Sequence, residues 1–236
     1  MDAGKGALLS LTNAHRHLHA ADVLGDEGLF GSASAHVILA LEELAKSWAL
    51  TLMFIGFDLP KRMLADVLKR HDVRHSITFG FLFNAMIQGL RARAEVRVQK
   101  RHRVKNFPPE LRDEFVTELK LEFKSLGSGH RGENPLIILI EWTGGASDLK
   151  NQGLYVDFDG ERWTHPRRIT QKRFAAGFVL ASMLIKRLGK TIREAHKTGF
   201  QLDDDLKESL TREMARKRPS DAGEILEDLT KMALLV

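Results

Sequence analysis

One stretch near the N-terminus, residues 33–46, places the strongest constraint on the fold. It reads Ala-Ser-Ala-His-Val-Ile-Leu-Ala-Leu-Glu-Glu-Leu-Ala-Lys, which is strongly helical and apolar nearly all round, and it carries two adjacent carboxylates, Glu42 and Glu43. A helix that is apolar on all sides is a core helix, and Glu is rarely fully buried without a partner. We therefore expect at least one of these carboxylates to lie inside the protein, held by a positive group.

The rest of the chain reads as helical, with one short exception. Apolar residues recur at helical spacing, and this predicts helices over residues 5–24, 32–55, 60–69, 72–91, 110–126 and 169–197. Asp72 is the expected N-cap of the fourth helix. Residues 154–158 and 161–164 flank Asp159-Gly160, a dipeptide that suits a type I′ hairpin turn. The sequence therefore predicts an all-α helical bundle with one small inserted β-hairpin.

The domain boundary is expected near residue 200. Residues 1–200 form the predicted helical domain with the hairpin near 154–164, and residues 201–236 form a C-terminal helical extension. The chain has no Cys, which excludes disulfides, thiolate metal sites and a thiol nucleophile. No secretory signal is visible, and the apolar run 48–57 is too short to span a bilayer. We expect a cytoplasmic protein with no membrane contact.

Positive charge is concentrated after the fourth predicted helix. The chain carries a net charge of +5, which favours acidic partners such as nucleic acid. The excess gathers in seven residues: Arg91, Arg93, Arg97, Lys100, Arg101, Arg103 and Lys105. Such a segment suits RNA phosphates, or it is simply a solvated helix end. It contains no aromatic residue on which a base could stack, so sequence-specific recognition is not expected there.

Four pieces of the sequence occur in a familiar order. These are Asn13-Ala14, the block Leu-Ala-Leu-Glu-Glu-Leu-Ala-Lys at 39–46, the group His71, Arg74 and His75, and Lys-Asn-Gln-Gly-Leu-Tyr-Val-Asp at 150–157. From about residue 13 to 198 the chain resembles the AbiV family, bacterial abortive-infection proteins grouped with the HEPN superfamily. Ala45 stands where the family usually has Gly, and Arg74 where a Lys is more usual. The resemblance implies a HEPN-like bundle, a homodimer and a role in phage defence.

The resemblance also implies a catalytic group. HEPN ribonucleases carry an Arg, then a polar residue, then a His a few positions on, and Arg70, His71 and His75 have this form. Arg97 and His102 have the same spacing, but an apolar residue follows that Arg. A His can move the proton of a 2′-hydroxyl near neutral pH, and an Arg can bind phosphate oxygens. In HEPN nucleases the motif lies late in the domain, whereas here it lies in the first third.

Other roles for these residues stay open at this point. Arg70, Arg74, His71 and His75 can instead neutralise Glu42 or Glu43, forming a charge cluster to which Lys46 also belongs. His71 and His75 also have the i, i+4 spacing of metal ligands. No Glu-x-x-His pair exists to build a di-iron site, and we expect neither a metal nor another cofactor.

Residues outside this group are expected to be structural. Within the family block, Lys150, Tyr155 and Asp157 are expected to fix the packing of the hairpin. His15, His17 and His19 are interpreted as surface residues.

The functional prediction is a phage-defence protein that acts on RNA or on the translation machinery as a metal-independent ribonuclease. The alternative is a non-catalytic module of the same fold that binds RNA or a protein. In either case a phage or host protein is a possible trigger.

Overall fold

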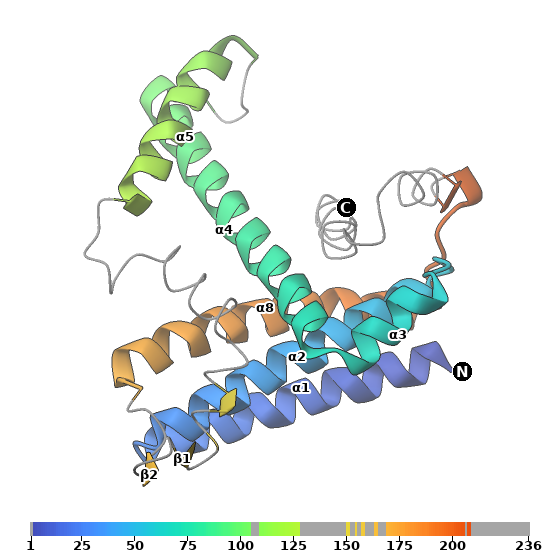
Figure 1. Ribbon diagram of the computed structural model, residues 1–236. Coiled ribbons are helices and arrows are strands. Elements are labelled where there is room, and N and C mark those ends of the chain that lie inside the picture. The colour runs from blue at the N-terminus through green and yellow to red at the C-terminus, as the bar shows by residue number, and fades with distance from the viewer. Residues whose placement is uncertain are drawn as a thin grey trace.

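The structure is a computed structural model that describes residues 2–104, 109–127, 150–151, 154, 157–158, 163–164, 169–205 and 207–208. This part of the chain is mostly helical, as predicted (Figure 1). The helices are α1 (Ala3–Asp26), α2 (Phe30–Phe54), α3 (Lys61–Lys69), α4 (His71–His102), η1 (Pro109–Leu111), α5 (Arg112–Gly127) and α8 (Gln171–Thr198).

The helix α2 is the centre of the bundle, because it is apolar on most of its surface. The helices α1, α3, α4 and α8 all contact it, and 16 of its 25 residues are buried. In Figure 1, α1 and α8 run along α2 over most of its length, and α4 crosses it. The Ser47 hydroxyl donates a hydrogen bond of 2.8 Å to the Ala7 carbonyl oxygen, which ties α2 to α1 inside the core.

Local sequence explains where the helices begin and end. Asp2 caps α1, its side chain accepting from the Lys5 amide at 2.9 Å, and Thr170 caps α8 in the same way. The turn between α1 and α2 uses Gly28 at φ +75°, a backbone conformation that favours glycine. Gly199 ends α8 in the left-handed conformation, as is common at helix C-termini.

The core is made by apolar side chains of the crossing helices. Trp48 on α2 meets Phe81 on α4 edge to face, with ring centroids 5.9 Å apart. Ile185 and Leu188 on α8 are fully buried. The Trp48–Phe81 contact fixes α4 against α2, close to the polar cluster described below.

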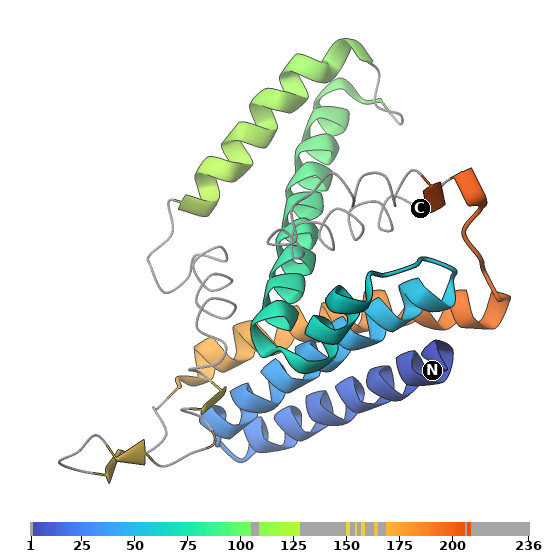
Figure 2. The ribbon, with the colours of Figure 1, turned by 45° about the vertical axis from the view of Figure 1, so that its right-hand side comes forward.

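The helix α4 continues far beyond the bundle. It is a single helix of 32 residues, and its C-terminal part packs on α5. We call residues 90–102 together with α5 the α4–α5 arm. Both views show the arm projecting away from α1, α2 and α8 (Figure 2).

The predicted hairpin is seen only in part. Strand β1 (Asp157–Phe158) pairs antiparallel with β2 (Trp163–Thr164), Asp157 opposite Thr164 and Phe158 opposite Trp163. Leu154, expected in the first strand, is helical. A ladder of two residues a side is marginal on its own, so an inserted hairpin of the predicted extent is not supported.

Several predicted features lie outside the described residues. They are the turn at Asp159-Gly160 and most of the proposed extension 201–236, so the domain boundary near residue 200 stays a prediction. Among the helices that the structure describes, none is long and apolar enough to cross a membrane.

Candidate functional site

The carboxylate of Glu42 is the centre of the candidate site. It lies on α2, is only 2% exposed, and faces the first turns of α4. Its Oε1 is 2.9 Å from His75 Nε2 and 3.2 Å from Lys150 Nζ. Its Oε2 is 2.7 Å from His71 Nδ1 and accepts two hydrogen bonds from Arg74, of 3.2 and 3.0 Å. Glu42 is thus the buried acid that the sequence led us to expect, and we call these five residues the Glu42 cluster.

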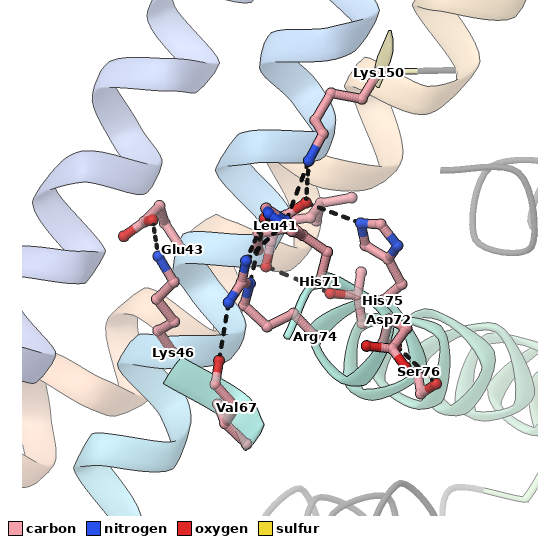
Figure 3. Close-up of polar contacts among 12 residues, drawn as sticks. Leu41, Glu43, Lys46, Val67, His71, Asp72, Arg74, His75, Ser76 and Lys150 are labelled. Carbon is pink, nitrogen blue, oxygen red and sulfur yellow. Dashed lines mark hydrogen bonds and ion pairs between the residues drawn. The ribbon is translucent and has the colours of Figure 1, made fainter. Parts of the chain in front are cut away.

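The Glu42 cluster joins parts of the chain that are far apart in sequence. Figure 3 shows His71, Arg74, His75 and Lys150 converging on one point of α2. Lys150 is 108 residues away from Glu42. The sequence predicted Lys150 only as a packing residue of the hairpin, so its place beside a buried acid is a finding of the structure.

Arg74 is the buried positive charge of the cluster, with 3% of the residue exposed. Its Nη1 donates to the carbonyl oxygens of Val67 and Leu68, at 3.1 and 3.2 Å. These carbonyls belong to the last turn of α3, where helical partners are lacking. All three guanidinium nitrogens of Arg74 are therefore engaged, and Arg74 holds α3, α2 and α4 together.

The Glu42 carboxylate is ionised in the folded protein. Burial by itself raises the pKa of Glu42. This effect is outweighed by the hydrogen bond with His75, the charge of Lys150 and the hydrogen bonds with His71 and Arg74. Together they hold the pKa of Glu42 far below its ordinary value. An ionised carboxylate only accepts hydrogen bonds, so we assign a proton to His75 Nε2 and, because the contact of 2.7 Å with Glu42 is its shortest, to His71 Nδ1. Arg74 Nη2 and Lys150 Nζ also lie 2.8 and 3.1 Å from His71 Nδ1, but as donors they do not hydrogen-bond to a protonated nitrogen.

The two histidines of the cluster differ in exposure. The side chain of His71 is 52% exposed, whereas that of His75 is 10% exposed. In the part of the chain that the structure describes, no hydrogen-bond partner is seen for His71 Nε2. His75, expected to be the catalytic His, is instead buried with its Nε2 against Glu42.

Arg70 takes no part in the Glu42 cluster. Its Nε and Nη2 donate to Asp72, at 3.2 and 2.6 Å, and Asp66 lies 3.8 Å from its Nη1. Arg70 and His75 thus have separate partners, and their expected catalytic pairing is not seen in these contacts.

The predicted N-cap at Asp72 is wrong. Arg70, extended at φ −101° and ψ 123°, is the residue that precedes α4, and it makes no side-chain cap hydrogen bond. The chain enters α4 directly from the end of α3 at Lys69, so Asp72 falls inside the first turn. A negative side chain is favourable in the first turn as well as at the N-cap, so the sequence alone did not show which of these two positions Asp72 occupies.

Glu43 and Lys46 form a pair of their own. They are joined by a close ion pair along α2, with side chains 16% and 22% exposed. The expected charge cluster of Glu42, Glu43, Lys46 and Arg74 is therefore divided into the buried Glu42 cluster and this more exposed pair.

The basic segment is partly neutralised by α5. The side chain of Arg101 is paired with Glu114 and Glu118, Arg97 lies 3.8 Å from Glu118, and His102 lies 2.5 Å from Glu114. The hydrogen bond with His102, then that with Arg101, lowers the pKa of Glu114. Four further cations of the segment are exposed on α4 or at its end: Arg91, Arg93, Lys100 and Arg103. The remaining one, Lys105, lies outside the described residues.

The other family residues are less informative. Asp157 lies in the β1–β2 ladder, and Tyr155 lies outside the described residues. Within the described ranges, no group of three or more His, Asp or Glu residues is placed to hold a metal ion. Arg74 and Lys150 also bring positive charge to the Glu42 carboxylate, which opposes a cation there.

Sequence reasoning missed one contact of α1. His17, expected on the surface, is half-buried against His36 of α2, with Nδ1 atoms 3.1 Å apart. His15 and His19 are exposed, as expected.

The fold and the cluster define a class of helical protein in which a buried acid on a central helix is met by a His-x-x-Arg-His group. The chain matches the model of the AbiV family (HEPN_AbiV) over residues 2–186 and therefore belongs to this family. Comparisons with curated proteins and with solved structures gave no match. Family membership points to abortive infection, a form of phage defence.

Proposed function

We propose that this AbiV protein defends the cell against phage as a cytoplasmic, metal-independent ribonuclease in which His71 moves the proton. The exposure of His71, anchored on a buried carboxylate, carries the proposal. With its Nδ1 proton held by Glu42, the Nε2 atom keeps a lone pair for the proton of a 2′-hydroxyl. Glu42 would orient the ring and stabilise the imidazolium that forms, and His75 would hold Glu42 in place.

The positive charge for the transition state is assigned to Lys150 and Arg70. An RNA phosphate gains negative charge as the 2′-oxygen attacks, and a cation nearby stabilises it. Lys150 has three N–H donors and lies 3.1 Å from His71 Nδ1. Arg70 precedes His71 and is more than half exposed. Arg74 is excluded from this role because it is buried, with only 3% of the residue exposed.

Cleavage of RNA by the purified protein in EDTA tests the proposal. We expect His71→Gln to lower the rate by about 10²–10⁴-fold, the usual contribution of a general acid–base group, with an unchanged circular dichroism spectrum. His19→Gln, an exposed His of α1, is the control and should cut like the wild type. If wild-type protein leaves total RNA intact, or if His71→Gln cuts at the wild-type rate, the proposal is refuted.

The same variants test the biological role. Phage plating efficiency on cells that express His71→Gln should return to that of unprotected cells, whereas His19→Gln should protect. The family resemblance further implies a homodimer, which light scattering of the eluting protein would measure directly.

A second candidate function is a non-catalytic module that captures RNA or an acidic protein through the α4–α5 arm. Lys100 and Arg103, both exposed near the end of α4, favour it. Glu114 and Glu118 of α5 are paired instead with Arg97, Arg101 and His102. The variant Lys100→Glu/Arg103→Glu should then weaken RNA binding and reduce its salt dependence by about two phosphate contacts. Unchanged binding in this variant, or loss of defence in His71→Gln alone, argues against this function.

A further inference from the structure

Two imidazoles meet between α1 and α2, on side chains that the proposed reaction does not use. His17 comes from α1 and His36 from α2, and their Nδ1 atoms are 3.1 Å apart. The ring centroids are 5.3 Å apart, and the ring planes are inclined by 41°. Both side chains are half-buried, so the two rings reach solvent while the helix packing holds them in place.

This spacing fits two ligands of one metal ion. Histidine nitrogens bind zinc at roughly 2.0–2.1 Å, so two nitrogens 3.1 Å apart would subtend an angle of about 95–102° at the ion. That angle is close to the values for neighbouring ligands in tetrahedral, square-planar and octahedral sites. The competing explanation for the short Nδ1–Nδ1 distance is a direct N–H···N hydrogen bond, which leaves no room for an ion between the two nitrogens.

Charged side chains of α2 act on the His17 imidazole. Glu43 and His36 are seven residues apart on α2, which places them two turns apart on one face. Burial lowers the pKa of the His17 imidazole, as does His36, while the charge of Glu43 acts in the opposite direction. The charge of Lys46 also lowers this pKa and that of Glu42 raises it, and the Glu43 carboxylate is paired with Lys46.

We propose that His17 and His36 bind a divalent transition-metal ion that prefers imidazole nitrogen, such as Cu²⁺ or Zn²⁺. The described residues offer no third ligand already in place, so this is a two-nitrogen site in which water completes the coordination. The ion would bridge α1 and α2.

Titration of the full chain with Cu²⁺, after treatment with a chelator and its removal, tests the proposal. We expect one tight equivalent in the wild type, weakened at least tenfold in His17→Gln and in His36→Gln. His19→Gln removes an exposed imidazole two residues along the same helix and should bind like the wild type. If all three variants and the wild type titrate alike, the metal is an adventitious ion only, and the proposal falls.

A spectroscopic measurement on the wild type covers the case in which a variant fails to fold. Electron paramagnetic resonance of the one-equivalent Cu²⁺ complex should show hyperfine splitting from two nitrogens. Splitting from one nitrogen or none overturns the proposal. The test is independent of the proposed ribonuclease, because RNA cleavage through His71 should continue in EDTA whether or not this ion is bound.

Discussion

Replacement of Glu42 by Gln gives the sharpest test of the structure. The variant keeps the size of the side chain and one acceptor oxygen, but it leaves Arg74 buried without a counter-charge. Removing one partner of a buried ion pair costs about 3–5 kcal/mol. Because Arg74 keeps its bonds to two backbone carbonyls, we expect the lower end, about 3 kcal/mol. Glu43→Gln is the matched control, since it breaks a partly exposed i, i+3 pair worth about 0.5 kcal/mol.

Urea denaturation followed by circular dichroism at pH 7 measures both variants. With a slope of about 2–3 kcal/mol per molar urea, Glu42→Gln should lower the midpoint by about 1 M or more, and Glu43→Gln by a quarter of that or less. An equal shift in the two variants would refute the assignment of Glu42 as the buried, ionised acid.

The difference in stability between the wild type and Glu42→Gln has a defined pH dependence. The pKa of Glu42 is lowered in the folded state from its ordinary value of 4.5. The stability that this group contributes is therefore fully present above pH 4.5 and is lost as the pH falls further. The difference between wild type and Glu42→Gln should shrink on acidification below that value. A difference that grows instead would show that the carboxylate is protonated in the folded protein.

Two more predictions concern packing and the arm. A Cβ on Gly25 would lie 2.4 Å from a ring carbon of Phe174, so Gly25→Ala should lower the free energy of unfolding by about 1–3 kcal/mol. The control Gly89→Ala, with open space around it, should be neutral or stabilising by up to about 1 kcal/mol. Equal urea midpoints for the two variants would contradict this prediction. Glu118→Gln, at a buried acid of the arm, should speed hydrogen exchange of α5 amides more than Glu114→Gln does, and identical exchange in the two variants would count against the pairing.

The helices were predictable from the sequence because their signals are local. The apolar surface of α2 and the spacing of Phe174, Phe178 and Ala181 on α8 follow directly from the helical period. The starting residue of α4 was not predictable, since an Asp at position 72 suits both the N-cap and the first turn of a helix.

The candidate site was predictable only in its composition. The sequence indicated that an acid of α2 meets the group after Lys69, but His71 and His75 share one helix face. Which of them is covered depends on how α4 crosses α2, and this is a tertiary property. The contact of Lys150 with Glu42 spans more than a hundred residues and leaves no local pattern. The pairing of Arg101 did leave a local pattern in the sequence, because its partners Glu114 and Glu118 are four residues apart and lie on one face of the next helix.

The single helix α4 has a mechanical consequence. Its 32 residues make a rod of about 48 Å, whose root is clamped by Arg74 and whose far end carries α5 outside the bundle. A tilt of 5° at the root swings the tip by roughly 4 Å over that length. A force applied at the tip therefore acts through a long lever arm on the root, where His71 and Arg74 contact Glu42.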